Sequence, residues 1–335
     1  MPDIKGKEIL ITGGTGSLGK ALTKALIPLK PKGIRIFSRS ELNQFNMQTE
    51  LKDVDLPISY IIGDIRDRDR LTMAFKGVDY VVNAAAMKRI EVCEKDPLEC
   101  VKTNVEGVSN VIYAALRNNV QKVLQVSTDK AVYPTTLYGA TKKVAEDLII
   151  NANVYSPASL VTNQPRFMAV RYGNVLGSNG SVLGIFLKQI KDGKRLTVTN
   201  PDMTRFWITL PDVCQFIINT LTNYEAGIHI PLMVSSKIND IVSALSVLQG
   251  RELFYDLIDT QINEKKHESL TTIEENPRLS KGDNRIIVNS KLQKENHISK
   301  YDVCPSHWTY NSEKEYTRHH KASKTLIKMI KEVIG

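Results

Sequence analysis

Tyr138 and Lys142 are the two residues of this chain whose types and spacing best suit acid and base chemistry. They lie four positions apart on a predicted helix, so they share one face of it. An ammonium group beside a phenol favours its ionisation, so Tyr138 could accept a proton from a hydroxyl although a free phenol has a pKa of about 10. By itself, however, the pattern Tyr-x-x-x-Lys also occurs in ordinary amphipathic helices.

The polar residues just before this helix extend the cluster. An apolar run at residues 123–126 predicts a strand, and open α/β sheets bind their ligands at the carboxyl ends of the strands. The side chains placed at that end are Thr128, Asp129 and Lys130. They add a hydroxyl, a carboxyl and an amine to the phenol and amine on the helix. We predict that all five residues are catalytic.

The beginning of the chain predicts a nucleotide-binding loop. An apolar run at residues 7–12 predicts a strand, residues 20–29 predict a helix, and three glycines lie between them. Such glycines permit a tight turn and a close approach of the backbone to a pyrophosphate, whose charge the helix N-terminus attracts. The residues predicted to hold a dinucleotide here are Gly13, Thr15, Gly16, Ser17, Leu18 and Gly19.

The next predicted strand, residues 34–37, bears on the choice of cofactor. It ends at Ser38, Arg39 and Ser40, and not at the acidic residue that would bind a free ribose 2′-hydroxyl. A cation with two hydroxyls suits a 2′-phosphate, so we predict NADP in preference to NAD. The alternative is that Arg39 is an ordinary surface residue.

Two further strands lead into predicted cofactor contacts. The strand at residues 58–62 runs into a carboxylate and an apolar side chain that could flank an adenine, and the strand at 80–83 runs into small residues that let the backbone approach the cofactor. A helix is predicted at residues 97–118. The cofactor residues predicted in these three segments are Asp64, Ile65, Ala84, Ala85, Ala86 and Asn104. Lys88 follows as the first cation placed to meet a substrate, or as an exposed lysine.

Strands and helices alternate regularly as far as a sixth strand at residues 167–171, which predicts an α/β fold with a doubly wound parallel sheet. Beyond residue 175 the alternation ends. We therefore predict a dinucleotide-binding Rossmann domain at 1–175. Residues 176–335 are predicted to form mainly a smaller α+β substrate lobe, with some segments returning to the Rossmann core. Residues 312–333 predict a final amphipathic helix that packs on the surface.

Composition excludes several classes of protein. With 335 residues, 42% hydrophobic and 24% charged, the chain predicts a globular protein and no disordered tract. The net charge of +9 is dispersed, and no nucleic-acid motif accompanies it, so nucleic acid is not an expected partner. Neither a signal region nor a membrane-spanning run is present, which predicts a cytoplasmic location without membrane insertion. The four cysteines and six histidines show no ligand or disulfide spacing, which predicts reduced thiols and no metal site.

In their order and spacing these motifs resemble the extended short-chain dehydrogenase/reductase superfamily. The closer resemblance is to the configuration-inverting UDP-N-acetylglucosamine 4,6-dehydratases of pseudaminic acid biosynthesis. The distinguishing pair is Asp129 with Lys130, since related dehydratases of nucleotide-activated glucose have glutamate in the second place and 4-epimerases lack such a pair. The membrane-associated, configuration-retaining relatives usually have methionine in place of Tyr138. The resemblance rests on residues 12–17, 38–42, 63–67, 127–131, 137–142, 171–175 and 203–209.

The resemblance implies a particular substrate, UDP-N-acetylglucosamine, and residues that bind it. Arg205, among aromatic residues, would hold the base or the diphosphate, or would lie on an edge strand next to a buried tryptophan. Asn263 stands where the family has a glycine in its Glu-Lys-x-His-Glu segment. The substrate residues implied are Lys88, Asn174, Ser181, Arg205, Glu264 and Lys265.

The implied reaction uses all five catalytic residues. Tyr138, assisted by Lys142, accepts the O4 proton while Thr128 hydrogen-bonds that oxygen, and the hydride leaves C4. Lys130 then removes the C5 proton and Asp129 protonates the departing C6 hydroxyl. The hydride returns to C6, and C5 is reprotonated from the opposite face to give UDP-2-acetamido-2,6-dideoxy-β-L-arabino-hex-4-ulose. Because Lys130 must be neutral, we expect burial and the nearby Lys142 to lower its pKa.

Other functions fit the same scaffold, because a fold does not fix a reaction. A nucleotide-sugar 4-epimerase or a C5-retaining 4,6-dehydratase is the nearest alternative, and a non-catalytic NADP-binding protein is a more distant one. The superfamily commonly pairs through the helices that correspond to residues 97–118 and 137–153. A homo-oligomer, either a dimer or a larger closed assembly, is therefore expected.

Overall fold

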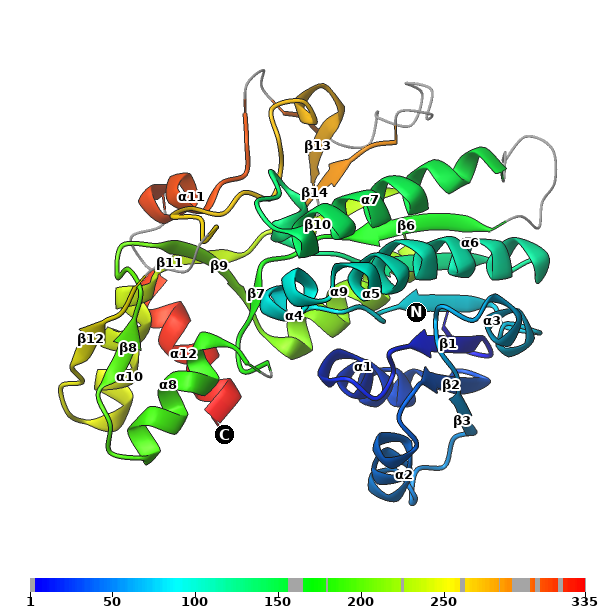
Figure 1. Cartoon of the computed structure of the whole chain (residues 1–335), viewed down its shortest axis with the longest axis horizontal. Helices are drawn as coiled ribbons and strands as arrows, with labels where there is room; N and C mark the ends of the chain where they lie inside the picture. Colours follow the sequence, from blue (N-terminus) through cyan, green and yellow to red (C-terminus); the bar gives the residue numbers. More distant parts are fainter. Residues whose placement is uncertain are drawn as a thin grey trace.

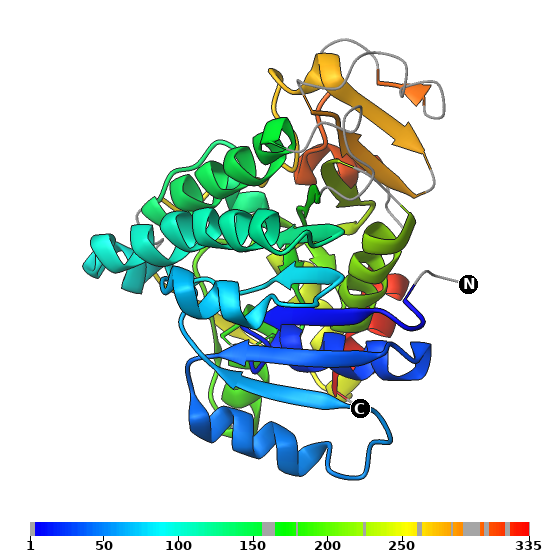
Figure 2. The same ribbon diagram turned by 90° about the vertical axis from the view of Figure 1, so that its right-hand side faces the viewer.

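The computed structural model describes residues 4–334 apart from 156–164, 179, 224–225, 260–262, 283, 291–301, 305–307 and 319–321. Within these residues the largest element is a ten-stranded sheet that extends from the top to the bottom of the molecule in the views of Figures 1 and 2. Its strands, in spatial order, are β15 (Asp302–Val303), β13 (Leu279–Gly282), β14 (Arg285–Val288), β10 (Gly227–Pro231), β6 (Arg166–Val170), β5 (Lys122–Val126), β4 (Tyr80–Asn83), β1 (Glu8–Thr12), β2 (Gly33–Ser38) and β3 (Ile58–Ile62).

The first six strands have the doubly wound order 3-2-1-4-5-6, with all neighbours parallel, as the sequence predicts. Apart from the edge strand β3, whose side chains are partly buried or exposed, these strands are covered on both faces, which explains why they appear in the sequence as nearly continuous apolar runs. In β1, for example, Leu10 packs into the core on one face, whereas Ile9 and Ile11 pack into the core on the other.

Helices form the two outer layers. One face is covered by α3 (Arg68–Ala74), α6 (Gly107–Arg117) and α7 (Leu137–Asn151), and Figure 1 shows α6 and α7 running side by side. The other face is covered by α1 (Ser17–Leu26), α2 (Glu41–Glu50) and α9 (Leu210–Asn223). The short elements are η1 (Ile27–Leu29), α4 (Ile90–Lys95), α5 (Pro97–Val101), η2 (Lys102–Glu106), η3 (Asp129–Ala131), η4 (Ala152–Tyr155) and η5 (Asn276–Arg278).

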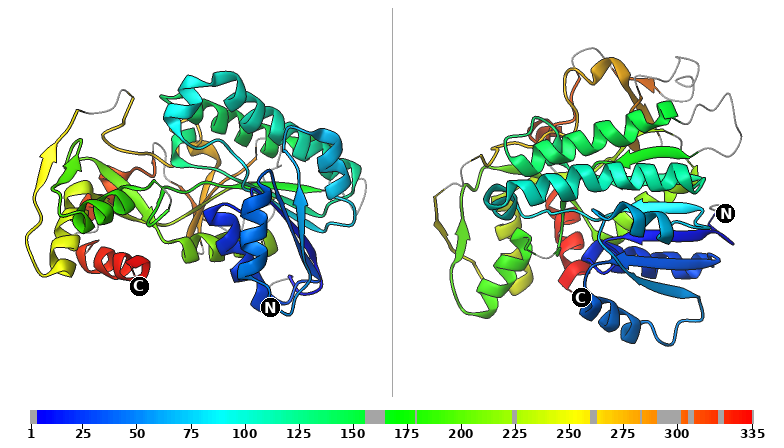
Figure 3. Two further views of the ribbon diagram at one scale, coloured as in Figure 1. Left: turned by 60° about the horizontal axis from the view of Figure 1, so that its bottom comes forward. Right: turned by 45° about the vertical axis from the view of Figure 1, so that its right-hand side comes forward.

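A smaller lobe with its own apolar core lies beside the sheet (Figure 3). Its elements are β7 (Asn174–Val175), α8 (Val182–Lys191), β8 (Leu196–Val198), β9 (Thr204–Ile208), β11 (Val234–Lys237), α10 (Ile238–Gln249), β12 (Tyr255–Leu257), α11 (Ser312–Arg318) and α12 (Ala322–Ile334). Between these elements the chain returns to the large sheet through α9, β10 and β13–β15. The division of the domains at residue 175 stays a prediction.

Two predicted helices differ from the structure. The segment predicted as one helix at 312–333 forms two, α11 and α12, which contact different parts of the lobe: α11 lies on β9 and β11, and α12 packs against α10. The segment predicted as one helix at 97–118 is continuous but has a π-helical turn, η2, between α5 and α6. Such turns often occur at functional sites because the extra residue redirects a side chain.

No helix among the described residues is both long and apolar enough to cross a membrane. Those residues also contain no group of three or more His, Cys, Asp or Glu side chains placed to hold a metal ion. His297, His307, His319 and His320 lie outside the described residues.

Candidate active site

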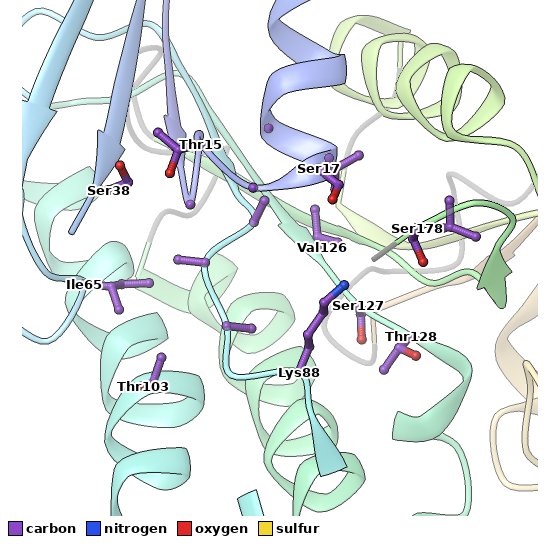
Figure 4. Close-up of a pocket in the computed structure, with 18 of the residues that line it drawn as sticks. Thr15, Ser17, Ser38, Ile65, Lys88, Thr103, Val126, Ser127, Thr128 and Ser178 are labelled. Carbon is purple, nitrogen blue, oxygen red and sulfur yellow. The ribbon is translucent and has the colours of Figure 1, made fainter. Parts of the chain in front are cut away.

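A cavity of about 520 Å³ opens at the carboxyl ends of the central strands, where the strand order reverses between β1 and β4. Figure 4 shows side chains from α1, from the strand ends and from the loop that carries Lys88 around this space. The predicted site residues that line it are Gly13, Thr15, Gly16, Ser17, Leu18, Gly19, Ser38, Arg39, Ser40, Ile65, Ala84, Ala85, Ala86, Lys88, Thr128, Lys130, Tyr138, Lys142 and Asn174. Those that do not line it are Asp64, Asn104, Asp129, Ser181, Arg205, Glu264 and Lys265.

The glycine loop is shaped to accept a pyrophosphate. Gly13 has φ +64, and a Cβ added there would lie 2.9 Å from the backbone of Ala85, so only glycine fits between these two loops. Helix α1 follows with Gly16 at its N-cap, and among the described residues no side chain caps its first turn with a hydrogen bond. These N–H groups and the helix dipole suit an anion, which makes the loop a fitting cradle for a dinucleotide.

At the end of β2 the predicted 2′-phosphate site combines a cation with two hydroxyls. Arg39 is 62% exposed in its side chain, and its Nη1 lies 3.9 Å from Oδ2 of Asp64. Ser38 accepts a hydrogen bond from the amide of Gln44 at 3.0 Å, and Ser40 caps α2 by accepting from the N–H of Asn43 at 3.2 Å. The oxygen of each serine therefore helps to hold the loop in place. Arg39, between the two serines in the chain, lines the cavity.

Asp64 is committed to a protein partner. Its carboxylate accepts from Arg66 at 3.0 Å and 2.6 Å, and Arg66 also pairs with Glu99. Although burial opposes ionisation, the hydrogen bonds and charge of Arg66, together with the charge of Arg39, hold the pKa of Asp64 below its usual value. Asp64 therefore does not line the cavity, where its predicted contact with the adenine would lie. Ile65, the next residue, lines it instead.

Asn104 has a structural role that the sequence prediction missed. Its side-chain oxygen accepts from the N–H of Met87 at 2.8 Å, and its amide donates to the carbonyl of Met87 at 3.0 Å and to the hydroxyl of Thr141 at 3.1 Å. Asn104 lies in the π-helical turn and is only 2% exposed. It ties the loop before Lys88 to helix α7 and does not line the cavity, as a cofactor contact would.

The turn after β5 brings the acid and base groups together. The hydroxyl of Thr128 donates to Oδ1 of Asp129 at 2.8 Å, and the ammonium of Lys130 lies 3.1 Å from the same oxygen. Burial alone would lower the pKa of Lys130, but the carboxylates of Asp129 and Glu268 outweigh it and raise that pKa above its ordinary value. The expectation that the pKa of Lys130 is lowered by burial and Lys142 is therefore wrong.

Tyr138 and Lys142 both line the cavity, but they are not coupled as predicted. The amine of Lys142 donates to the carbonyl of Val126 at 2.6 Å, and burial lowers its pKa to about 8. Burial raises the pKa of Tyr138 to about 12, while the charge of Lys130 and a hydrogen bond with Thr128 oppose that rise. The cation with the largest effect on Tyr138 is thus Lys130 and not Lys142.

Helix α7 is fixed firmly at the end that presents Tyr138. The hydroxyl of Thr136 accepts from the N–H of Gly139 at 3.1 Å, and the carboxylate of Glu94 accepts from the N–H of Leu137 at 2.8 Å. These acceptors satisfy N–H groups of the first turn, where a negative charge is also favourable. Gly139 packs directly on the carbonyl of Lys130, a contact that leaves no room for a Cβ. The helix and the catalytic turn are thereby held against each other.

The predicted substrate residues fall into two groups. Lys88 and Asn174 line the cavity, and Figure 4 shows Lys88 extending from its loop toward the side where Ser127 and Thr128 lie. Ser181 instead caps α8, where the N–H of Gly184 lies 3.5 Å from its hydroxyl. The remaining three, Arg205, Glu264 and Lys265, form a separate cluster.

That cluster joins the lobe to the catalytic turn. Arg205 pairs with Glu264 at 3.1 Å, and Lys265 donates to the carbonyl of Val132, the residue that ends the turn, at 2.6 Å. Strand β9, which carries Arg205, is the middle strand of a three-stranded sheet, so the edge-strand alternative is wrong, although Trp207 is indeed buried. Asn263 has φ +75, a conformation that asparagine tolerates, so it can replace the glycine of the family without a change of path.

Several residues of the cavity were missed, although all of them lie in or beside a predicted motif or element. Tyr172 is the most prominent because it is buried and has its pKa raised by burial, with a further contribution from Tyr138. Its position directly after the sixth predicted strand was the signal that could have identified it. The missed residues are Phe37, Asn43, Gly63, Thr103, Val126, Ser127, Tyr172, Gly173, Val175, Ser178 and Leu210.

The doubly wound sheet, the glycine loop and the Tyr138–Lys142 pair at its switch point define an extended short-chain dehydrogenase/reductase. Within that class, residues 9–290 match the polysaccharide biosynthesis protein family, and the chain belongs to this family.

Curated relatives and a solved structure agree with this assignment. The chain is 40% identical over 301 residues to a UDP-N-acetylglucosamine 4,6-dehydratase (inverting) of Campylobacter jejuni subsp. jejuni serotype O:23/36 (strain 81-176), covering 89% of this chain and 87% of the relative. It is 40% identical over 275 residues to a UDP-glucose 4-epimerase of Rickettsia prowazekii, covering 80% and 79%. The X-ray structure of Pen from Bacillus thuringiensis superposes with a TM-score of 0.87 at 35% identity, covering 98% and 99%.

Proposed function

We propose that this protein is a UDP-N-acetylglucosamine 4,6-dehydratase that inverts C5. The observation that carries the proposal is the 3.1 Å contact between Asp129, which is fully buried, and Lys130, which lines the cavity together with Tyr138. A dehydratase needs a base for the C5 proton and an acid for the C6 hydroxyl, in addition to the group that oxidises C4. An inverting dehydratase is also among the relatives that share 40% identity over most of the chain.

The residues at C4 would be Tyr138 and Thr128. Tyr138 accepts the proton of the O4 hydroxyl, and Thr128 hydrogen-bonds that oxygen once its hydroxyl turns away from Asp129. The charge of Lys130 favours the ionised phenol that this step requires. Lys142, which donates to the Val126 carbonyl, would hold the cofactor and not ionise Tyr138.

Lys130 and Asp129 would perform the elimination. A proton can pass between them across their 3.1 Å contact, which converts the ion pair into a neutral amine and a neutral carboxylic acid. The amine then removes the C5 proton. The carboxylic acid gives its proton to the C6 hydroxyl as the C6–O bond breaks and water leaves. Protonation of C5 from the opposite face later inverts that centre.

A nicotinamide dinucleotide fits the glycine loop, and when bound it supplies a reversible hydride acceptor, so C4 can be oxidised and C6 reduced without net redox change. The residues that would hold its phosphates are in the loop from Gly13 to Gly19 and at the N-terminus of α1. We infer NADP in preference to NAD, because Arg39 offers a cation at the position of a 2′-phosphate. Ala84–Ala86 allow the backbone to approach it closely.

The test is incubation of the purified protein with UDP-N-acetylglucosamine in deuterium oxide without added cofactor, followed by nuclear magnetic resonance of the product. We expect a new C6 methyl group, a keto group at C4 and one solvent deuterium at an inverted C5. An unchanged hydroxymethyl group at C6 with inversion at C4 would instead establish the epimerase. A methyl group with C5 retained would establish the retaining dehydratase.

The epimerase remains the second candidate because relatives with that name share 40% identity with the chain. It needs Tyr138 but has no use for a base at C5. Replacement of Lys130 by alanine therefore separates the two functions: it should abolish dehydration, whereas epimerisation should persist at a lower rate because Tyr138 loses a charge that favours its ionisation.

We also propose that the protein is a homo-oligomer that pairs through α5, α6 and α7. These elements carry Leu98, Tyr113 and Val144 with 70%, 40% and 44% of their surface exposed, which is an apolar set beyond the core-facing residues. Burial of that set by a second copy would form a symmetric interface. Light scattering that gives the mass of one chain at micromolar concentration would contradict this.

A further inference from the structure

Glu268 lies next to the catalytic turn, although no role in the chemistry has been assigned to it so far. The segment from Asn263 to Glu268 is fixed on the turn by two hydrogen bonds: Thr135 donates to the carbonyl of Asn263 at 3.0 Å, and Lys265 donates to the carbonyl of Val132 at 2.6 Å. The backbone N–H of Glu268 donates to the hydroxyl of Ser312 at 2.9 Å. Glu268 is therefore held in place from both sides.

Asp129 and Glu268 share an unusual condition. Asp129 is fully buried and Glu268 is 4% exposed, and each has one carboxyl oxygen, Oδ2 and Oε2, without a hydrogen-bond partner among the described residues. A buried carboxylate oxygen without a partner is costly, whereas a protonated carboxyl can donate. Two carboxyls that both act on one amine, as these do on Lys130, can reduce that cost by sharing one proton.

The charged groups around the two carboxyls are few. Glu268 faces Asp129, Lys130, Arg205 and Lys265, and the ammonium of Lys265 lies 3.7 Å from its Oε2. Burial, followed by the charge of Asp129, raises the pKa of Glu268, and the three cations oppose that rise. On the other side of Asp129 stand the hydroxyl of Thr128 and the ammonium of Lys130, both on Oδ1.

Lys130 in turn faces both carboxylates and the phenol of Tyr138. Its charge thus favours ionised carboxyls, while burial and the mutual repulsion of Asp129 and Glu268 favour a proton on one of them. A carboxyl pair that holds one proton meets both conditions. One carboxyl is neutral, and the other keeps a single negative charge opposite Lys130.

We propose that Asp129 and Glu268 form a carboxyl pair that shares one proton, and that Glu268 is the positioning residue that keeps this proton available at Asp129. The inference rests on the proposed dehydratase reaction. Lys130 first passes its proton to the pair and becomes a neutral amine. It then receives the C5 proton, while Asp129 gives a proton to the C6 oxygen as the C6–O bond breaks. Lys130 is then charged and the pair holds one proton, as at the start, so no proton is gained or lost.

The first test measures the pH dependence of solvent deuterium incorporation at C5 in Glu268→Gln. Glutamine keeps the shape of the side chain but removes its charge and its titratable proton. Without the second carboxyl the site loses its proton more easily, so the alkaline limb of the rate profile should move to lower pH by on the order of one unit. Loss of the same charge also weakens the hold on the Lys130 proton, so the acid limb should move in the same direction. A purely structural defect would lower the rate at every pH without moving either limb.

Glu268→Asp is the matched variant. It keeps a carboxyl on a chain that is shorter by one methylene, so its rate should fall while the two limbs of its profile stay near the wild-type positions. If Glu268→Gln has the wild-type profile, or if Glu268→Asp shifts as far as Glu268→Gln, the shared proton is refuted.

A second measurement separates this inference from the proposed function, because it needs no substrate. Infrared difference spectra of protein with carbon-13 in its aspartate carboxyls should show a band of buried carboxylic acid that disappears at lower pH in Glu268→Gln than in the wild type. Asp129→Asn should remove the band. If the wild type incorporates no deuterium at C5, the proposed function fails, and this titration alone decides whether the pair exists. An unchanged band in Glu268→Gln would overturn the pair.

Discussion

The amine of Lys142 donates a hydrogen bond to the carbonyl of Val126 at 2.6 Å, so the lysine of the Tyr-x-x-x-Lys pattern is anchored to the end of strand β5. The side chain is buried, and burial lowers its pKa to about 8. The attraction of Glu146, one turn further along α7, opposes this, but Glu146 already pairs with Arg171. Lys142 therefore changes charge within an accessible pH range, so the free energy of unfolding should depend on pH in that range.

The first prediction is that the free energy of unfolding rises with pH between about pH 8 and about pH 9.5, and that Lys142→Met removes most of this rise. The folded-state pKa of about 8 lies below the ordinary value of 10.5, so the unfolded chain binds more protons in that interval. The slope for one group is about 1.4 kcal/mol per pH unit, which gives on the order of 2 kcal/mol. Denaturant unfolding at a series of pH values measures it.

Lys143 provides the control for this measurement, and the titration of Tyr138 does not overlap with it. Lys143→Met, at the next and more exposed position, leaves Lys142 in place and should keep the wild-type slope. Tyr138 does not interfere, because burial raises its pKa to about 12 and the stability linked to it is lost only above about pH 10. Equal slopes in wild type and Lys142→Met would show that the amine does not titrate as described.

The second prediction concerns the nucleotide that the protein carries. Because no acid stands at the end of β2 and Arg39 does, we expect the purified protein to release chiefly NADP when it is denatured. Arg39→Asp places a negative charge at the same position and should shift the bound nucleotide toward NAD. Chromatography of the released nucleotide is the measurement.

The matched control for Arg39→Asp is Lys52→Asp, which makes the same change of charge on the exposed segment after α2, away from the cavity. It should leave the NADP content unchanged. Release of mainly NAD from the wild type, or an unaltered preference in Arg39→Asp, would show that this loop does not choose the cofactor.

The third prediction is a stability effect at Arg171, which is fully buried. Its guanidinium pairs with Glu146 at 2.6 Å and with Glu275 at 2.8 Å, and it donates to the carbonyl of Leu270 at 2.8 Å. It thereby joins α7 and β6 to the segment from the C-terminal half. Arg171→Met leaves two buried carboxylates without their cation, so we expect a loss of about 3–5 kcal/mol in the free energy of unfolding.

Arg195→Met serves as the control for Arg171→Met. Arg195 pairs with Asp256 at 2.6 Å, but both side chains are more than half exposed. Such a pair contributes about 0–1 kcal/mol, because water and salt screen it. Equal losses in the free energy of unfolding for Arg171→Met and Arg195→Met, measured by denaturant unfolding, would show that the buried network stabilises the fold no more than an exposed ion pair does.

Much of the fold could be predicted because each central strand is covered on both faces and therefore stands out in the sequence as an apolar run. The strands at 58–62 and 80–83 have the predicted bounds, and the glycine loop lies where the pattern indicates. The end of the chain was predicted as one helix on the apolar face of Leu326, Ile327, Met329, Ile330 and Val333, but all five residues lie in α12, and the position of α11 on β9 and β11 is set by contacts with distant parts of the chain.

The errors in the site have one physical cause, which is that the partner of a polar side chain is set by tertiary contacts. The spacing of Tyr138 and Lys142 places both on one helix face, but it cannot show that the carbonyl of Val126 takes up the amine. Nor could it show that Glu268, far along the chain, raises the pKa of Lys130. Nor could the spacing show that Asn104 hydrogen-bonds the loop at Met87 and Thr141 of helix α7, and its contact with the cofactor stays a prediction.

The fourth prediction separates the two parts of the proposed reaction, because Tyr138 serves the oxidation of C4 and Lys130 serves the C5 proton. Tyr138→Phe removes the group that accepts the O4 proton and should slow both reduction of the bound cofactor and product formation by about 10²–10⁴-fold. The control is Tyr133→Phe, which removes a phenol that is 45% exposed and lies outside the cavity residues. It should retain turnover.

Lys130→Ala should fail at a later point than Tyr138→Phe. Tyr138 and Thr128 remain, so C4 is still oxidised, but without the amine the C5 proton stays in place and the elimination cannot proceed. Loss of the Lys130 charge also removes a force that lowers the pKa of Tyr138, so oxidation should be slower than in the wild type and faster at higher pH. The variant should therefore accumulate bound reduced nicotinamide, visible as near-ultraviolet absorbance, and should incorporate no solvent deuterium at C5. Normal turnover in Lys130→Ala, or deuterium at C6 with none at C5 in the wild-type product, would refute the roles assigned to these two residues.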